Sequence, residues 1–135
     1  MTDDCSFELA LKLEKEGNSA EALEKYTKFI NETTSKITKS ETEKLALAYN
    51  NRGFLKYLQV DFDGAVEDYT ASIQINNKAA ITYYNRGTVH YRMSRFDKAI
   101  SDMSRSLTLD PNFEPAKTAL FHAEQDKINK ENRPW

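Results

Sequence analysis

The sequence has few of the residues that crosslink, kink or terminate a polypeptide chain. Cys5 is the single cysteine among 135 residues, so we expect neither a disulfide framework nor a cysteine-rich metal site. Only three prolines and four glycines are present, a scarcity that favours an all-helical chain. No apolar run is long enough for a signal peptide or a membrane span. We therefore expect residence in the cytoplasm, with the nucleus as the alternative.

The chain also lacks an excess of charge of either sign. Lys and Arg total 19 and Asp and Glu total 21, which gives a formal net charge of −2. Nucleic acids and anionic membranes are normally bound through a basic excess, so we expect neither as the main partner.

Sequence signatures of catalysis are missing as well. The chain has no Gly-rich phosphate loop, nucleophile elbow or HExxH pattern. The two histidines, His90 and His122, stand at no metal-ligand spacing with each other or with Cys5. We therefore expect no enzymatic activity, no cofactor and no bound metal.

The sequence does contain an internal repeat, because the segment from Tyr49 to Asn77 recurs from Tyr83 to Pro111. Ten residues recur at a fixed separation of 34. In the first copy they are Tyr49, Asn51, Arg52, Gly53, Tyr57, Phe62, Asp63, Ala65, Asp68 and Ser72, and in the second Tyr83, Asn85, Arg86, Gly87, Tyr91, Phe96, Asp97, Ala99, Asp102 and Ser106. A fixed period of this length is typical of stacked repeats, in which no single copy can bury its apolar face alone.

Each copy has the pattern of a helical hairpin. Apolar residues recur at three- and four-residue spacing over 46–59 and again over 63–76, which predicts two amphipathic helices. The segment between them, residues 60–62, is long enough only for a tight turn, so the helices should be antiparallel. Asp61 or Asp63 is suited to cap the second helix.

Gly53 and Ala65 indicate how closely the two helices approach. A glycine inside a helix costs roughly 1 kcal/mol relative to alanine, so its presence needs a compensating reason. Without a side chain at Gly53, the two backbones can come close, and Phe62 can close the end of the hairpin. Gly87, Ala99 and Phe96 repeat this arrangement in the second copy. We assign none of these residues a role in ligand binding.

These residues resemble the tetratricopeptide-repeat signature. The matching segments are Asn85-Arg86-Gly87, Phe96-Asp97-Lys98-Ala99 and Leu109-Asp110-Pro111, and Asn51-Arg52-Gly53 of the first copy. The first copy departs from the pattern at Asn77, where the family has proline, and Lys56 and His90 replace apolar residues. The resemblance implies an all-α fold, a right-handed α–α superhelix of three helical hairpins with a C-terminal capping helix.

A weaker copy precedes the two clear ones, and a single helical pattern follows them. Together they give one predicted domain over residues 1–135. Its parts are repeat 1 at about 3–32, an insert at 33–45, repeat 2 at about 46–79, repeat 3 at about 80–113, a capping helix at 114–130 and a tail at 131–135. The insert could extend the two flanking helices or form a mobile loop, and its Ser and Thr residues could be phosphorylated or simply solvated. The pattern assigns no role to Trp135.

The resemblance also implies a binding surface, because a peptide lies along the inner wall formed by the first helices of such repeats. Carried onto this chain, that groove contains Asn50, Asn51, Phe54, Tyr57, Tyr84, Asn85, Thr88, Tyr91, Arg92 and His122. Phe7, Leu11, Leu58, Thr118 and Gln125 would extend it. The amides can bond to a peptide backbone and the aromatic rings supply flat contact area. Tyr57 and Tyr91 could alternatively fill the gap between adjacent hairpins.

The best-known groove of this family grips the C-terminal carboxylate of heat-shock chaperones with Lys, Asn and Arg side chains. At its five positions this chain has Phe7, Leu11, Asn51, Ile81 and Asn85, so one of the five is kept. A carboxylate needs cationic partners to offset its lost hydration. We therefore expect a neutral, partly aromatic peptide or helix as ligand.

Two hypotheses about function follow. The first is a non-catalytic protein-binding adaptor, monomeric, with a protein or peptide ligand. The alternative is a structural or self-associating module whose groove is occupied by its own tail or by a second copy. Arg52 with Asp68, and Arg86 with Asp102, recur in both copies and are expected to form structural ion pairs, worth under about 1 kcal/mol each if they are exposed.

Overall fold

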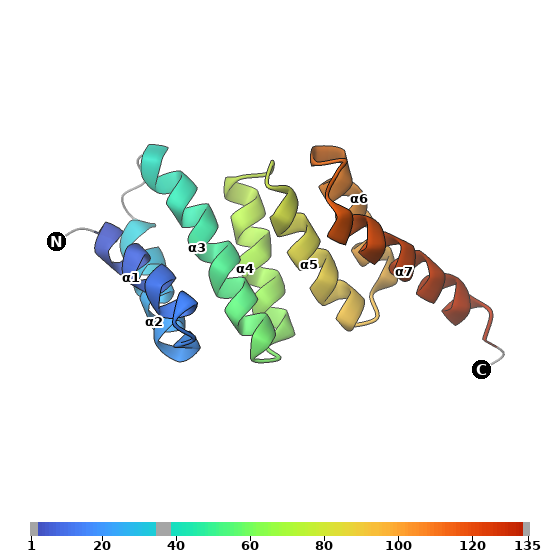
Figure 1. Cartoon of the computed structure of the whole chain (residues 1–135), viewed down its shortest axis with the longest axis horizontal. Coiled ribbons are helices and arrows are strands. Elements are labelled where there is room, and N and C mark those ends of the chain that lie inside the picture. Colours follow the sequence, from blue (N-terminus) through green and yellow to red (C-terminus); the bar gives the residue numbers. More distant parts are fainter. Residues whose placement is uncertain (1–2, 35–38, 134–135) are drawn as a thin grey trace. The chain divides into compact units, whose positions relative to one another are not determined.

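The computed structural model describes residues 3–34 and 39–133, and this part of the chain forms seven helices and no strand (Figure 1). The helices divide into two compact units, Met1–Asn77 and Lys78–Trp135, which we describe separately. The first unit contains α1 (Asp3–Lys15), α2 (Ser19–Thr33), α3 (Lys39–Leu58) and α4 (Phe62–Ile75). The second contains α5 (Ala80–Arg92), α6 (Phe96–Leu109) and α7 (Glu114–Glu131).

In the first unit each helix packs on the next one along the chain, α1 on α2, α2 on α3 and α3 on α4. The apolar residues that the sequence places on one face of each helix are the ones that become buried. The resulting core consists of Phe7, Ala10, Leu13, Ala22, Tyr26, Phe29, Ile30, Leu45, Ala48 and Leu55. Phe7, which the resemblance placed on the inner wall, is therefore a core residue in contact with Tyr26 and Phe29.

Close helix approach at the repeated glycines is confirmed. A Cβ atom added at Gly53 would lie 2.9 Å from Cε1 of Tyr69 and 3.3 Å from the carbonyl oxygen of Ala65. At Gly87 it would lie 3.0 Å from Cβ of Asp102. The glycines thus allow α3 to contact α4, and α5 to contact α6, so closely that a side chain at either position would require its neighbours to shift.

Each hairpin turn passes through one residue in the left-handed region of backbone conformation. These residues are Gly17 (φ 84°), Val60 (φ 63°) and Ser94 (φ 59°), which occupy the same place in the three hairpins. Glycine adopts this conformation without strain, whereas a β-branched residue does so rarely. All three hairpins therefore have the same left-handed turn, although only the first has glycine at this position.

The predicted helix cap and aromatic closure are also confirmed. Oδ1 of Asp61 accepts a hydrogen bond from the backbone N–H of Gly64 at 3.0 Å, at the first turn of α4. The ring of Phe62 lies 5.7 Å from that of Tyr57, and the ring of Phe96 lies 5.8 Å from that of Tyr91. In the α3–α4 and α5–α6 hairpins an aromatic pair therefore closes the end at which the turn lies.

Most of the insert before the second copy is helical where it is described. Helix α3 begins at Lys39, ahead of the predicted start at residue 46, so the insert lengthens this helix. Helix α2 ends at Thr33, and residues 35–38 lie outside the described part of the chain. Of the two alternatives for the insert, helix extension is thus correct for residues 39–45.

Helix α7 has the predicted character of a capping helix. Ala116 and Ala123 are buried, and Pro115 stands in the first turn, where its missing N–H group is not needed. Helix α7 contacts α6 and, less extensively, α5. Phe121 follows Gly87 by the repeat period of 34 residues, so a large ring stands where the two clear copies have glycine. It is 59% exposed.

Candidate functional site

A cavity of about 540 Å³ opens between α5, α6 and α7 in the second unit. It is lined by Tyr84, Thr88, Tyr91, Met103, Glu114, Pro115, Thr118, Ala119 and His122. A volume of this size is typical of sites that take a small ligand or several side chains of a peptide. We refer to it as the α5–α7 pocket.

The helical repeat explains why these side chains converge. Tyr84, Thr88 and Tyr91 stand four and three residues apart, which places them on one face of α5. Thr118 and His122 are four residues apart and share a face of α7 in the same way. Four of the ten predicted groove residues, Tyr84, Thr88, Tyr91 and His122, thus line one pocket.

Contacts within the unit hold the pocket walls in place. The ring of Tyr84 packs edge-on against Phe113 with 5.2 Å between ring centroids. Oγ1 of Thr88 donates a hydrogen bond to the carbonyl oxygen of Tyr84 at 2.9 Å. The hydroxyl of Tyr91 donates to the carboxylate of Asp126 on α7, and this bond raises the pKa of Tyr91. Because both tyrosines are anchored at their edges, their ring faces are held in fixed positions.

The pocket has a mainly apolar wall and little charge. Its floor includes Met103, which is fully buried, and Ala119 and Pro115 add apolar surface. Among the described residues, no lysine or arginine lines it, and Glu114 is the one ionisable carboxylate that does. That carboxylate also accepts from Nζ of Lys117 at 3.1 Å. The chemistry of the wall favours apolar or aromatic groups over an anion.

Sequence reasoning missed several residues that form this pocket. Met103 belongs to the apolar stripe of α6 and carries no signal that distinguishes pocket floor from core. Glu114, Pro115 and Ala119 enter because α7 leans on α5 and α6, and the periodicity of one helix does not encode that tilt. Asn85 and Arg92, which were predicted to lie in the groove, do not line the pocket.

The other four predicted groove residues lie on α3 in the first unit. The amide of Asn51 donates to the hydroxyl of Tyr26 at 3.1 Å, and that hydroxyl donates to Glu14 at 2.7 Å. Nδ2 of Asn50 approaches Oδ1 of Asn51 at 3.4 Å. Burial and the Glu14 contact raise the pKa of Tyr26, so this hydroxyl stays protonated as a donor. The side chain of Asn51 thus takes part in a hydrogen-bond chain that joins α3 to α2 and α1.

Phe54 and Tyr57 stack on α3 with 6.4 Å between ring centroids. Phe54 is exposed, as are Leu47 and Leu58 on the same helix. Leu47, Phe54 and Leu58 are spaced by seven and four residues, so they form one apolar stripe. Tyr57 also contacts Phe62, so it contributes both to hairpin closure and to this surface.

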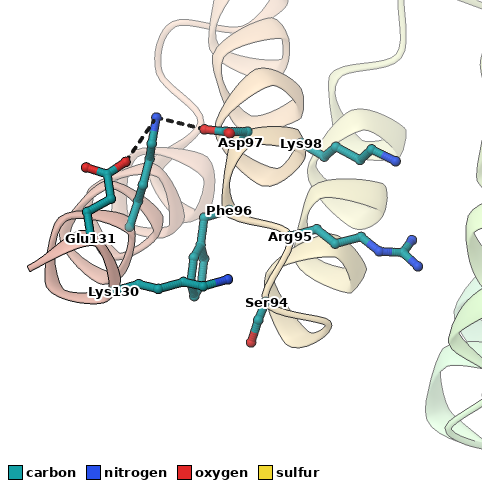
Figure 2. Close-up of a pocket in the computed structure, with 8 residues that line it drawn as sticks. Ser94, Arg95, Phe96, Asp97, Lys98, Lys130 and Glu131 are labelled. Atoms are coloured by element: carbon teal, nitrogen blue, oxygen red, sulfur yellow. Dashed lines mark ion pairs between the residues drawn. The ribbon is translucent and has the colours of Figure 1, made fainter. Parts of the chain in front are cut away.

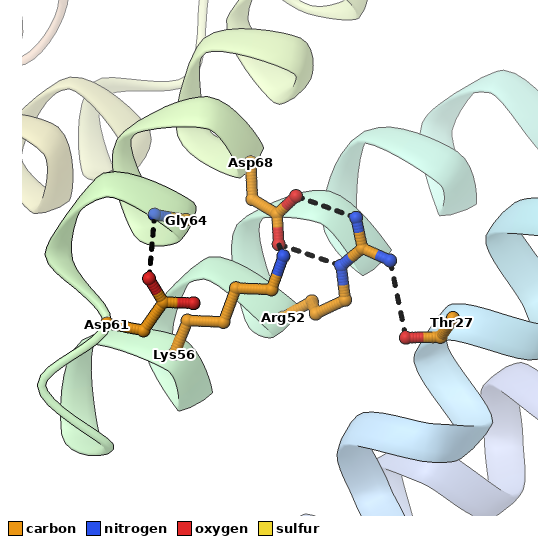
Figure 3. A network of polar contacts seen from close by, with 6 residues as sticks. All are labelled: Thr27, Arg52, Lys56, Asp61, Gly64 and Asp68. Atoms are coloured by element: carbon orange, nitrogen blue, oxygen red, sulfur yellow. Dashed lines mark hydrogen bonds and ion pairs between the residues drawn. The ribbon is translucent and has the colours of Figure 1, made fainter.

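The repeated Arg–Asp pairs are structural, as expected, but they are not exposed. Arg52 binds both carboxylate oxygens of Asp68 at 2.7 Å, and Nζ of Lys56 lies 3.1 Å from Oδ2 of the same residue (Figure 3). Nη1 of Arg52 also donates to Oγ1 of Thr27 on α2 at 3.2 Å. In the second unit Arg86 binds Asp102 in the same two-point manner, at 2.8 and 2.9 Å. Each pair joins the two helices of its own hairpin.

His90 stands where Lys56 stands in the preceding copy. Its side chain is buried, and its Nε2 lies 3.9 Å from Oδ2 of Asp102. Its Nδ1 has no hydrogen-bond partner within the described residues. Burial lowers the pKa of His90, and the nearby cations Arg86, Lys98 and Arg95 lower it further, while Asp102 acts in the opposite direction. His90 is therefore neutral at physiological pH.

No group of three or more His, Cys, Asp or Glu side chains in residues 3–34 and 39–133 is arranged to hold a metal ion. Within those same ranges, no helix combines the length and apolar character needed to cross a bilayer.

Residues 80–113 match the family model of the tetratricopeptide repeat. The structure resembles the Arabidopsis OM64 TPR domain, with 23% identity, a TM-score of 0.80 and coverage of 92% of this chain and 95% of that one. It also resembles the first TPR of Spaghetti (RPAP3) bound to the HSP90 peptide SRMEEVD, with 22% identity, a TM-score of 0.82 and coverage of 93% of each chain.

A third similar structure is the second TPR domain of human RPAP3 in complex with the HSP70 peptide SGPTIEEVD. It shares 23% identity with this chain at a TM-score of 0.75, and the match covers 88% of this chain and 92% of that one. At these identities the likeness concerns the fold. The predicted all-α fold class is confirmed: the chain has the fold of tetratricopeptide-repeat domains, and its residues 80–113 match the family model of that repeat.

Proposed function

We propose that this protein is a non-catalytic protein-binding module that takes a peptide or a helix on the first-helix faces of its repeats. The observation that carries the proposal is the α5–α7 pocket, whose wall combines tyrosine ring faces with the polar edges of Thr88, Thr118 and His122. Rigid aromatic surface beside a few hydrogen-bonding groups is typical of protein-recognition hot spots. Two of the similar structures hold peptides, which supports the same class of ligand.

The wall chemistry favours an apolar or aromatic peptide segment without a carboxylate at its centre. The peptides in those two structures, SRMEEVD and SGPTIEEVD, each contain several acidic residues. An anion entering the α5–α7 pocket would lose hydration and meet Glu114 rather than a lining cation. The exposed stripe of Leu47, Phe54 and Leu58 on α3 supports a second apolar contact surface in the first unit. We therefore propose a neutral or basic ligand rather than a chaperone tail.

The proposal is tested by obstructing the pocket from an exposed helix position. In Thr118→Phe the new ring points into the pocket from α7, where Thr118 is exposed and makes none of the wall contacts described above. Glu124→Phe adds the same ring at another exposed position of α7 that does not line the pocket. We expect a random peptide library to yield neutral or basic aromatic ligands of the wild-type protein. Thr118→Phe should weaken them by at least about tenfold, equivalent to 1.4 kcal/mol, and Glu124→Phe should leave them unchanged.

The peptide SRMEEVD serves as the probe of specificity, and we expect calorimetry to detect no binding at concentrations that saturate the selected ligands. Tight binding of SRMEEVD would contradict the proposed specificity while leaving a protein-binding function intact. Selected ligands that bind Thr118→Phe as tightly as wild type would move the site away from the pocket. The self-associating alternative predicts instead a mass that rises with protein concentration in analytical ultracentrifugation.

A further inference from the structure

Several polar groups in the wall of the α5–α7 pocket can only accept hydrogen bonds. Oγ1 of Thr88 donates its proton to the carbonyl oxygen of Tyr84, and the hydroxyl of Tyr91 donates its proton to Asp126. Because a hydroxyl has a single proton, both oxygens offer a ligand only their lone pairs. The ionised carboxylate of Glu114 is likewise an acceptor without a donor. A ligand that suits this wall therefore donates hydrogen bonds.

The charge of the pocket points to the same kind of ligand. Phe113, the residue before Glu114, packs edge-on against Tyr84, so the Tyr84 ring and the Glu114 carboxylate lie at the same end of the pocket. The cation bonded to that carboxylate is Lys117, which does not line the pocket; the two side chains are 46% and 75% exposed. An exposed pair of this kind contributes little, so another cation can replace Lys117 at Glu114.

Two lysines near the other end of α7 are held elsewhere. Nζ of Lys127 lies 2.8 Å from Oδ1 of Asp97, and Nζ of Lys130 lies 5.7 Å from the ring centroid of Phe96, beside which its side chain runs in Figure 2. Both lysines line a separate cavity of about 590 Å³. About 20 Å of helix separates Lys127 from Glu114, so it does not balance the charge of that carboxylate.

We propose that the peptide bound by the α5–α7 pocket is anchored there by an arginine side chain. This inference rests on the proposed function, because it names the part of the peptide that enters the pocket. A guanidinium group offers N–H donors and no acceptor, and it stacks on aromatic rings. Its plane lies on the ring of Tyr84 and its N–H groups bond to Glu114 and Thr88. Its alkyl stem covers the apolar surface of Pro115 and Ala119.

Other side chains match this wall less well. The ammonium group of lysine is a compact and strongly hydrated charge that cannot stack as a plane. A tyrosine or tryptophan ring brings one donor and no positive charge, so it leaves acceptors of the wall without a partner. The two-point contact that arginine makes with a carboxylate already occurs twice within this protein, from Arg52 to Asp68 and from Arg86 to Asp102.

The experiment starts from the ligands that the random peptide library yields and that Thr118→Phe weakens. We expect these peptides to share an arginine next to their aromatic residue. Each is then synthesised with citrulline in place of that arginine, which keeps the shape of the side chain and removes its charge. Calorimetry should show binding at least about fivefold weaker, as expected when a cation is lost from an aromatic ring beside a carboxylate.

Two protein variants test the partner of the arginine. Glu114→Gln and Glu124→Gln each remove one negative charge from an exposed position of α7, but only Glu114 lines the pocket. In Glu114→Gln the arginine and citrulline peptides should bind about equally, and in Glu124→Gln the preference for arginine should remain that of wild type. Lys117→Gln, which frees Glu114 of its cation, should strengthen the arginine peptides by about twofold.

The possible failures can be told apart. Citrulline peptides that bind as tightly as arginine peptides, pocket ligands that contain no arginine, or an arginine preference unchanged in Glu114→Gln would overturn this inference. Each of these results leaves the peptide-binding function intact, because the ligands still depend on the pocket. A library that yields no ligand weakened by Thr118→Phe would overturn the proposed pocket and this inference together.

Discussion

Val60 has a side chain that does not suit its backbone conformation. Its φ of 63° lies in the left-handed region, where the equivalent residue of the first hairpin is Gly17. The side chain is 71% exposed, so it contributes little burial in return. The left-handed conformation costs a residue other than glycine roughly 1–2 kcal/mol, because its Cβ atom comes too close to the following carbonyl oxygen.

We therefore predict that Val60→Gly raises the free energy of unfolding by about 1 kcal/mol. The backbone strain that glycine relieves in the folded state should exceed the free energy lost because glycine makes the unfolded chain more flexible. Urea denaturation followed by circular dichroism measures the change. Val60→Ala keeps a Cβ atom and should show a much smaller gain. A loss of stability in Val60→Gly would mean that the turn is not strained.

His90 makes the stability of the second unit sensitive to acid. Because burial and the cations Arg86, Lys98 and Arg95 lower its pKa, the folded protein holds His90 neutral more strongly than the unfolded chain does. Above the ordinary histidine pKa of about 6.5 neither state is protonated and the full stability is present. As the pH falls through and below that value, the unfolded state takes up the proton first and stability is lost.

The test is a series of thermal melts from about pH 8 to about pH 5 on wild type and His90→Gln. We expect the melting temperature of wild type to fall relative to that of the variant below about pH 6.5, and the difference to be constant above pH 7. The variant removes the titration while keeping a polar side chain of similar reach, and carboxylates common to both proteins cancel. Parallel pH profiles would show that His90 is protonated equally well in both states.

At the scale of elements, the Arg–Asp pairs determine how the two helices of a hairpin are held together. In the first unit Arg52 reaches Asp68 on α4 and Thr27 on α2, so one guanidinium ties three helices. Lys56 adds a second cation at 3.1 Å from the same carboxylate. The second unit has only neutral His90 at that place, at 3.9 Å. The carboxylate of Asp68 thus compensates two mostly buried cations, and that of Asp102 compensates one.

This difference predicts unequal costs for the same substitution. Asp68→Ala should lower the free energy of unfolding by about 3 kcal/mol, because it leaves Arg52 and Lys56 without their carboxylate in a largely buried place. Asp102→Ala should cost about 2 kcal/mol, since one cation is affected and its side chain is 21% exposed. Urea denaturation gives both values. Equal costs, or a larger one for Asp102→Ala, would show that Lys56 contributes nothing at this site.

Sequence alone was sufficient for most of the elements. The 34-residue period and the apolar spacing predicted the helices, the tight turns and the close approach at Gly53 and Gly87, because each depends on residues near in sequence. The start of α3 was left open, since the polar residues before it suit a solvated helix and a solvated loop equally. The left-handed turn at Val60 gave no signal, because valine is among the residues least expected there.

For the whole molecule, prediction stops where helices from separate parts of the chain meet. The spacing of Tyr84, Thr88 and Tyr91 indicated a common face on α5, but their assembly into a pocket depends on the tilt of α7. That tilt is set by buried contacts of Ala116 and Ala123, whose small size could equally serve other crossings. The burial of the Arg–Asp pairs was left open for the same reason, since exposure is a property of the packed unit rather than of a helix.

Phe121 has a consequence for modular protein engineering. Helix α7 follows α5 by the repeat period, so the bulky ring of Phe121 occupies the position of Gly53 in α3 and Gly87 in α5. At those glycines α3 and α5 make close contact with α4 and α6. A grafted helix intended to pair with α7 as α4 pairs with α3 would collide with that ring. Concatenation of consensus repeats onto this scaffold therefore requires Phe121→Gly as its first change, and without it the ring acts as a steric stop to further stacking.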